Sequence, residues 1–216
     1  MPLTPPTAQT VSQGMTQAQA SFALTYPGDV YYNVAKPYVQ QGINNHNAVE
    51  IARGFVVLLI NWDTSFYIRQ KENQSYSIKD ALIHHKRYFS PDYLERIKKM
   101  MEDLLKNYDL ILMDFSQRSI DGMISDIDEQ NIKKIFQKLQ DVLGPVGAGM
   151  SLSLIGPDFF PSWNNSIAKA YGLNELQKKY NQNKYFKFMK EVKNIKSQLG
   201  TNVSLKALDE YNWMTY

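Results

Sequence analysis

The residues most suited to binding a ligand form a glycine-rich segment, Gly144–Gly149, between two stretches with helical periodicity. A glycine-rich turn that leads into a helix leaves backbone N–H groups without partners, and the helix dipole adds partial positive charge there. Because Gly147 and Gly149 lack a Cβ, an anion such as phosphate could approach this backbone closely. The residues of the predicted anion-binding turn are Gly144, Val146, Gly147, Ala148 and Gly149. A tight connection in which the glycines only let two helices touch explains the same pattern.

A second group of candidate residues follows in the run Pro157–Ile167. Asp158 is the carboxylate of this run, although an aspartate directly after proline is also typical of a turn or a helix cap. The rings of Trp163 and of Trp62, in the first half of the chain, could stack on a base. Aromatic residues at helical spacing are equally typical of a hydrophobic core.

Positive charge is concentrated near the C-terminus. Residues 169–206 contain nine lysines and two glutamates, a local net charge of +7, whereas the whole chain has a net charge of +3. In the helical pattern over 184–199, apolar residues share one side, and the outward side carries the lysines at 184, 187, 190, 193 and 196. This pattern fits a solvated helix face, and it also fits a surface that follows the phosphates of a nucleic acid.

The elements that must position these residues are helical almost throughout. Residues 1–25, rich in proline, threonine, glutamine and alanine, are predicted to form a flexible arm that could contain a short helix around Thr16–Leu24. Residues 26–216 are predicted to form an all-α domain of one or two interlocked lobes, in which the helical patterns of 128–156 form a hairpin around Gly144–Gly149. The expected helices are 47–60 with Asn47 as cap, one opened by Ser90 and Pro91, one capped by Asp126 or Asp128, and others at 150–155, 164–172, 184–199 and 205–213. Asp109–Phe115 is compatible with a buried strand or a helix.

Composition narrows the class of protein. Apolar residues are 44% and charged residues 21% of 216, close to the average of globular proteins, so the chain can form a core. The absence of cysteine excludes disulfides, thiolate zinc sites and a cysteine nucleophile, and three histidines are too few to predict a metal site. The longest apolar run, Phe55–Ile60, is far shorter than the roughly 20 residues of a membrane span. The first 28 residues carry no charge and do not resemble a signal peptide, so we expect a cytoplasmic protein.

Three runs together resemble the helix-hairpin-helix (HhH-GPD) DNA glycosylase superfamily, and most closely an uncharacterised base-excision-repair-like branch of it. The runs are Leu143–Gly149, Phe160–Ile167 and Leu208–Trp213. The superfamily's hairpin reads apolar–Pro–Gly–Val–Gly, and Leu143, Val146 and Gly147 occupy its apolar and glycine positions. The branch continues with a Pro-Asp-Leu-Phe-Pro-Met-Trp-Asp segment, similar to the second run. The match covers about residues 128–172 and the C-terminal tail, whereas the N-terminal half matches only in being helical.

The resemblance implies a two-lobed all-α fold of the helix-hairpin-helix DNA glycosylase type that binds double-stranded DNA. In that family the amides of the hairpin hold a phosphate, and its carbonyl groups often bind a monovalent cation; no other cofactor is implied. A base is flipped into a cleft, where an aspartate stabilises the sugar cation that forms as the glycosidic bond breaks.

Two positions depart from the family pattern. The lysine of members with lyase activity falls at Gly149 or Met150, and neither side chain can form a Schiff base. The catalytic aspartate falls at Asn164, which can cap a helix but carries no charge. Three hypotheses follow. The first is a DNA-binding protein with weak or no glycosylase activity. The second is a monofunctional DNA glycosylase that hydrolyses the N-glycosidic bond with another carboxylate such as Asp158, and the third is a non-enzymatic helical interaction protein.

Overall fold

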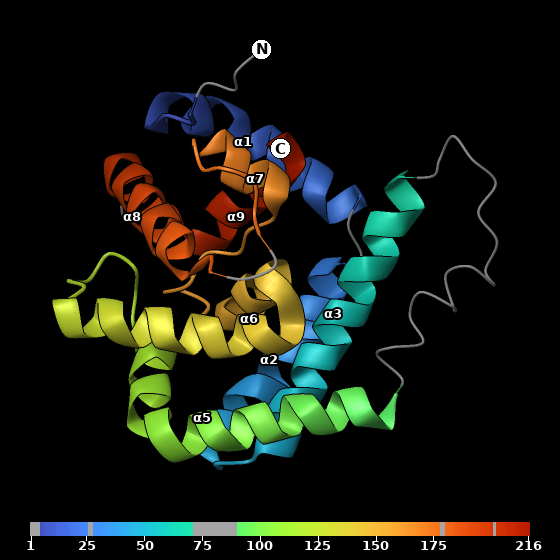
Figure 1. Ribbon diagram of the computed structural model, residues 1–216. Helices are drawn as coiled ribbons and strands as arrows, with labels where there is room; N and C mark the ends of the chain where they lie inside the picture. The colour runs from blue at the N-terminus through green and yellow to red at the C-terminus, as the bar shows by residue number, and fades with distance from the viewer. Residues whose placement is uncertain (1–4, 26–27, 71–89, 178–179, 201) are drawn as a thin grey trace. The chain divides into compact units, whose positions relative to one another are not determined.

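All regular secondary structure in the described part of the chain is helical. The structure, a computed structural model, describes residues 5–25, 28–70, 90–177, 180–200 and 202–216. Its helices are α1 (Ala8–Thr25), α2 (Gly28–Asn44), α3 (Ala48–Gln70), α5 (Pro91–Gln117), α6 (Asp126–Ile155), α7 (Asn165–Ala170), α8 (Gln182–Leu199) and α9 (Leu205–Thr215) (Figure 1). None of the described residues lies in a strand, which confirms the all-α prediction.

The chain forms two compact units whose boundary falls inside a helix. The middle unit is Tyr26–Asp109, and the composite unit combines Met1–Thr25 with Leu110–Tyr216. Helix α5 crosses the boundary, where Tyr108 interrupts the helical backbone with φ −136° and ψ 16°. No linker marks this point, so the composition of the sequence carries no signal for it. The other boundary follows Thr25 and coincides with the predicted division at residue 25. The prediction that residues 26–216 form one domain apart from the first 25 residues is wrong, because Met1–Thr25 belongs with Leu110–Tyr216.

The middle unit is built around the pair of helices α2 and α3. As predicted, Asn47 caps α3: its Oδ1 accepts hydrogen bonds from the backbone N–H groups of Val49 (3.1 Å) and Glu50 (3.3 Å). Gly54 lets the two helices approach closely, since a Cβ there would lie 2.8 Å from the carbonyl oxygen of Ala35. The apolar side chains buried in this unit include Val39, Ile43, Ile51, Phe55, Leu58 and Leu59.

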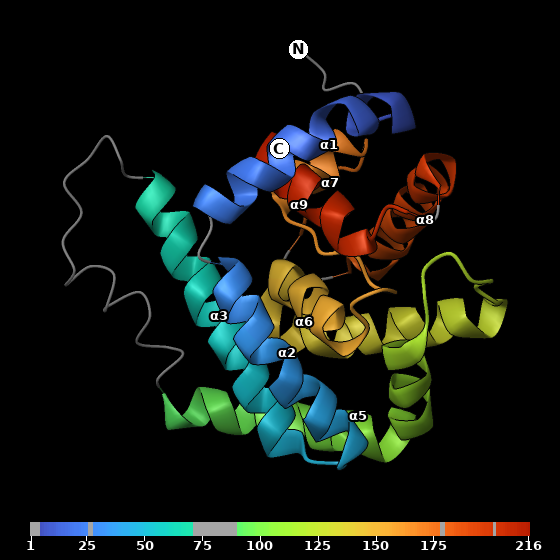
Figure 2. The ribbon, with the colours of Figure 1, turned by 180° about the vertical axis from the view of Figure 1, so that it is seen from behind.

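The N-terminal residues of the composite unit form a packed helix, α1, which includes the short helix expected around Thr16–Leu24 and starts earlier, at Ala8. The predicted flexible arm is therefore wrong for this segment. Helix α1 lies beside α9 (Figure 2). Val11 is fully buried, and the Tyr211 hydroxyl donates a hydrogen bond to the carbonyl oxygen of Thr10 (3.4 Å). A Cβ at Gly14 would lie 2.7 Å from the Tyr211 ring, so the glycine permits this close approach. The uncharged composition of the segment suits a helix with one side buried.

The run Asp109–Phe115, compatible with strand or helix from its sequence, is part of α5. Leu112 and Phe115 are fully buried whereas Leu110 is 79% exposed, which is the spacing of a helix with one buried side. The Phe115 ring stacks on Phe159 with 5.0 Å between ring centroids. This contact joins the end of α5 to the segment that follows α6.

Helix α6 starts before the predicted cap and continues through the glycine-rich segment. Ser125 is its N-cap: the Ser125 side chain accepts from the N–H of Asp128 (3.2 Å), and the Asp128 carboxylate accepts from the N–H of Ser125 (2.8 Å). The predicted loop at Gly144–Gly149 is absent, because α6 bends at Gly144 (φ 77°, ψ 171°) and resumes. Figure 1 shows α6 as two segments that run in different directions. Pro145 needs no N–H partner and therefore suits the first position of the resumed helix.

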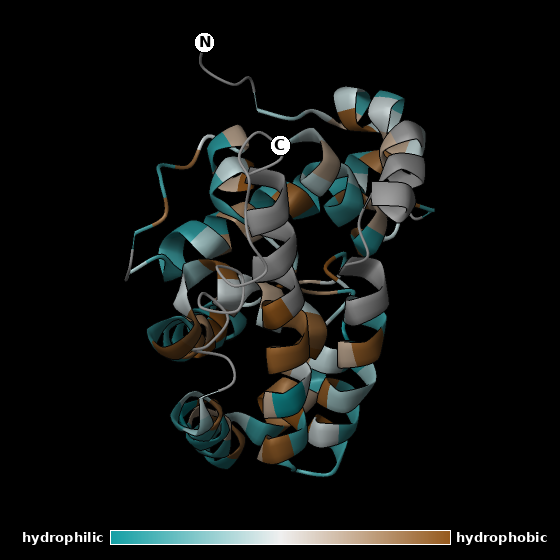
Figure 3. Cartoon of the chain, turned by 90° about the vertical axis from the view of Figure 1, so that its right-hand side faces the viewer, coloured by the Kyte–Doolittle hydropathy of each residue, from teal (hydrophilic) through white to brown (hydrophobic). Residues whose placement is uncertain are grey.

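Helices α7, α8 and α9 complete the composite unit around an aromatic core. In Figure 3, brown apolar residues alternate with teal polar ones along the helices, as expected for helices buried on one side. The large side chains that form this core and expose no surface are Phe115, Phe136, Phe159, Phe160, Trp163, Tyr185 and Phe188. The inward residues predicted for 184–199, among them Tyr185, Phe188 and Val192, are buried in α8, which confirms that part of the prediction.

Candidate nucleic-acid interface

The bend at Gly144 starts a new helical run whose first amides are the ones suited to an anion. No atom would lie within 4 Å of a Cβ at Gly144, so the backbone is open on this side, and its positive φ favours glycine. A helix that resumes after a bend leaves the N–H groups of its first turn without partners inside that helix. Pro145 has no N–H, and Gly147, Ala148 and Gly149 are buried. The half-buried Gly144–Val146 is therefore the accessible part of the predicted anion-binding turn.

Gly149, at the far end of the segment, serves helix packing. A Cβ at Gly149 would lie 2.5 Å from Cδ1 and 2.7 Å from Nε1 of Trp163. The same indole N–H donates a hydrogen bond to the carbonyl oxygen of Pro145 (3.0 Å). The glycine thus lets the Trp163 ring lie against α6, as the packing interpretation of the sequence expects for this position.

Trp163 lies in the aromatic core, which is not an open base pocket. Its ring exposes no surface, meets Phe136 and Tyr185 edge-on at centroid distances of 5.8 and 5.1 Å, and stacks on Phe188 at 5.7 Å. The prediction that Trp163 lines a base pocket is wrong, because its ring packs against three other aromatic rings and leaves no surface on which a base could stack. Trp62 lies in α3, and its side chain is outside the described part of the structure.

Asn164 and Asp158, the candidates for the catalytic carboxylate position, lie at the surface of the same segment. Asn164 is the N-cap of α7, and its Oδ1 accepts from the N–H of Ile167 (2.8 Å), which confirms that this residue caps a helix. The Asp158 side chain is exposed, and its carbonyl oxygen accepts from the N–H of Ile120 (2.8 Å). In both residues the observed contacts stabilise the chain around position 160.

The carboxylate with the most unusual environment is Asp209 in α9, which sequence reasoning missed. Its Oδ2 accepts hydrogen bonds from both the N–H and the Oγ of Ser162 (2.9 Å each), while its buried Oδ1 has no partner in the part of the chain that the structure describes. Burial raises the pKa of Asp209 to about 7, although the two bonds from Ser162 oppose this rise. A signal was present: Leu205, Leu208, Asp209 and Asn212 have the spacing of one buried helix face.

The surroundings of Asp209 indicate a positioning role. The Trp213 indole donates to the Ser162 hydroxyl (2.9 Å), and the Tyr185 hydroxyl donates to the carbonyl oxygen of Pro161 (2.9 Å). These bonds hold the segment around residues 161–163 between α8 and α9. Ser162 is itself buried, so the carboxylate of Asp209 faces protein groups.

The lysines of α8 divide into two groups. Lys196 forms an ion pair with Asp121, and Lys193 donates to the carbonyl oxygen of Gly122, so both bind the loop between α5 and α6. Lys184 donates to the carbonyl oxygen of Glu175 (2.8 Å). These three lysines serve structural contacts, and the expectation that all five share an outward cationic face is wrong for them.

Of the remaining two lysines of α8, Lys187 and Lys190, the second lies close to a lysine of α6. The ammonium groups of Lys133 and Lys190 lie 5.4 and 4.7 Å from the centroid of the same ring, Phe186. Both also approach Glu129, at 2.5 Å from Lys133 and 3.7 Å from Lys190. One carboxylate therefore serves two ammonium groups, which leaves a net positive charge at this contact.

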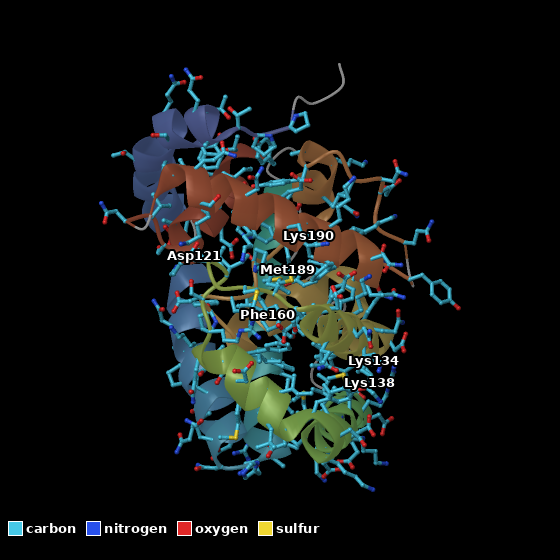
Figure 4. All side chains as sticks on the ribbon, turned by 90° about the vertical axis from the view of Figure 1, so that its left-hand side faces the viewer. Asp121, Lys134, Lys138, Phe160, Met189 and Lys190 are labelled. Carbon is cyan, nitrogen blue, oxygen red and sulfur yellow. The ribbon has the colours of Figure 1, made fainter. Side chains whose placement is uncertain are left out.

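Lys134 and Lys187 extend this charge along the two helices. Both are exposed, and among the described residues neither has a hydrogen bond or an ion pair. We call Lys133, Lys134, Lys187 and Lys190 the α6–α8 lysine surface. Figure 4 labels Lys134 and Lys138 on α6 and Lys190 on α8, higher in that view. The surface places four positive groups on two adjacent helices.

Among the described residues, no group of three or more histidine, aspartate or glutamate side chains is arranged to hold a metal ion. In the same residues no helix has the length and apolar character needed to cross a membrane. Comparison with known proteins found no relative: no family model, no curated protein and no solved structure matches the chain.

Proposed function

We propose that this protein binds double-stranded DNA through the α6–α8 lysine surface and does not cleave glycosidic bonds with the residue at position 164. The observation that carries the proposal is that Lys133 and Lys190 share one acidic residue, Glu129, while Lys134 and Lys187 are exposed on the same two helices. A surface of this kind neutralises phosphates and releases their counterions, which is the main source of affinity for a nucleic acid.

The charge of this surface favours a polyanion over a small acidic ligand. Among the described residues, Lys134 and Lys187 have no partner that would have to be displaced, and the side chain of Lys190 is 62% exposed. Four ammonium groups spread over two helices match a row of phosphates, whereas a single anion would need them to converge on one point. The resemblance to helix-hairpin-helix glycosylases supports DNA as the polyanion.

The start of the resumed helix at Gly144 supports the same proposal as a secondary contact. Helix starts with free amides hold phosphate groups, and Gly144–Val146 is the accessible part of this one. The buried Gly147 and Gly149 take no part in this contact. The proposal therefore depends on the lysines first and on the bend second.

The environment of Asn164 supports the absence of glycosylase chemistry at that position. Its side-chain oxygen is occupied by the N–H of Ile167, and a neutral amide cannot offset the positive charge that develops on a sugar. The one buried carboxylate described in this segment's surroundings, Asp209, is bound by Ser162. These two environments support the part of the proposal that excludes base release at position 164.

The test is fluorescence anisotropy on a labelled duplex at increasing salt concentration. Four phosphate contacts predict a slope of about −3 to −4 in the logarithm of affinity against the logarithm of salt. The double variant Lys187→Gln/Lys190→Gln should lower the magnitude of this slope by about 2. A matched control, Lys99→Gln/Lys106→Gln, removes two exposed charges from α5 in the middle unit and should leave the slope nearly unchanged.

Two results would contradict the proposal. The first is no binding by the wild-type protein at about 50 mM salt, where phosphate contacts are strong. The second is an equal loss of affinity in both double variants, because binding would then follow the net charge of the protein and would not involve a defined surface.

A further inference from the structure

We infer that the exposed ring of Tyr180 is a stacking platform for an unpaired nucleobase at one end of the α6–α8 lysine surface. This inference rests on the proposed DNA binding and adds the kind of DNA that would be preferred. Tyr180 directly precedes α8, and its side chain is 72% exposed. No ring contact or hydrogen bond involves this side chain among the described residues.

The backbone of Tyr180 is left-handed, with φ 64°. A residue with a Cβ is strained in this region, and glycine or asparagine is favoured there. The exposed ring also leaves a large apolar surface in water. Both features are unfavourable for folding, so the contacts within the protein do not explain why a tyrosine occupies this position. Strained residues of this kind are concentrated at binding sites.

The residue that follows Tyr180 anchors it firmly. Asn181 is fully buried, its Nδ2 donates to Gln140 Oε1 (2.8 Å) and to the carbonyl oxygen of Gln177 (2.6 Å), and its Oδ1 accepts from the N–H of Gln177 (3.0 Å). The backbone N–H of Asn181 also donates to Gln140 Oε1 (3.2 Å). These bonds hold Asn181 in place directly after Tyr180. The ring of Tyr180 is therefore presented from a rigid base, which lowers the entropy lost when a ligand binds it.

The same contacts place Tyr180 relative to the lysines. Asn181 contacts Gln140 of α6, whereas Phe186, further along α8, contacts Lys133, which is seven residues earlier in α6. The two helices therefore run in opposite directions, and Tyr180 lies at the end of the lysine surface nearest the Gly144 bend. With about 1.5 Å of rise per residue, Lys187 lies about 10 Å from Tyr180 along α8. This span corresponds to about three nucleotides of a DNA strand.

An aromatic ring beside a row of phosphate contacts is the arrangement with which proteins hold unpaired bases. Stacking on a base is possible for any base because each has a π-face, and it does not depend on salt. The lysines would hold the backbone and Tyr180 would hold one base. We therefore expect a preference for a duplex with a bulged base over a fully paired duplex.

The experiment compares the binding of two labelled duplexes, one fully paired and one with a single bulged adenine, by anisotropy. Wild-type protein should bind the bulged duplex about tenfold more tightly, and Tyr180→Phe, which keeps the ring, should preserve this ratio. Tyr180→Gly should bind both duplexes equally and keep the salt dependence of the wild type. Because glycine accepts a φ of 64° without strain, Tyr180→Gly should unfold at the same urea concentration as the wild type or a higher one.

The outcomes separate this inference from the proposed function. If Tyr180→Gly still prefers the bulged duplex, or if the wild type has no preference, the stacking role is wrong and the lysine surface is unaffected. If Tyr180→Gly unfolds at a lower urea concentration, Tyr180 serves stability and the inference is overturned. Binding of neither duplex by the wild type would contradict the proposed function itself.

Discussion

The buried carboxylate of Asp209 should make the protein less stable as the pH rises from acid to neutral, and Asp209→Asn should remove this dependence. Burial raises the pKa of Asp209 from 3.8 to about 7 in the folded protein. Between these two values the folded state keeps a proton that the unfolded state has lost. The stabilising contribution is therefore complete below pH 3.8 and is lost as the pH rises towards 7, the reverse of a salt-bridged aspartate.

The size of this loss of stability follows from the shift of the Asp209 pKa. Each unit of pKa difference corresponds to about 1.4 kcal/mol, so the contribution of Asp209 should fall by about 3 kcal/mol between about pH 4.5 and 7. An asparagine keeps an oxygen that can accept from the N–H and Oγ of Ser162, and it has no proton to lose. The quantity to measure is the free energy of unfolding in urea of the wild type minus that of Asp209→Asn at each pH, because the other ionisable groups cancel in this difference.

The difference should decrease with pH up to about 7 and stay constant above it. Asp158→Asn is the matched control, since it removes an exposed carboxylate from the neighbouring segment. A difference between wild type and Asp209→Asn that stays constant from acid to neutral pH, or increases, would refute the reasoning, because Asp209 would then be ionised in the folded protein.

Three further predictions follow from single positions. Gly149→Ala should lower the free energy of unfolding in urea by about 1–3 kcal/mol, because its Cβ would lie 2.5 Å from the Trp163 ring; an unchanged midpoint would contradict the close packing. Asn164→Ala should cost about 1 kcal/mol in the same assay through loss of the cap, whereas Asn164→Asp should retain the stability of the wild type. Wild-type protein should release no free base from lesion-containing duplexes, as measured by chromatography, and release by the wild type would support the monofunctional glycosylase hypothesis.

The parts of the fold that depend on local spacing could be predicted. The buried side of α8 and the caps at Asn47 and Asn164 follow from residues within a few positions of each other, and the structure confirms them. The helical state of Asp109–Phe115 was not decided by its sequence, because a short apolar run fits a strand or a helix equally well. In the structure this run is helical, and its Phe115 is buried against Phe159.

The candidate site was predicted less well, because its features depend on distant residues. Lys196 looked like an outward lysine, yet its partner Asp121 is 75 residues away in the chain. Gly149 looked accessible until Trp163 was placed against it. Composition also suggested a loose N-terminus, but α1 packs on α9 from the other end of the chain.

Hydrophobic periodicity and capping residues were enough to establish a helical protein with a lysine-rich helix near its C-terminus and an interruption of the helical pattern at Gly144. These properties depend on the geometry of the chain over one or two turns, where each residue has known neighbours. Other properties depend on which helices pack together. These are the ion pairing of the lysines, the burial of Trp163 and the raised pKa of Asp209. Burial and charge pairing are properties of those contacts, and a contact such as Asp209 with Ser162 joins residues 47 positions apart.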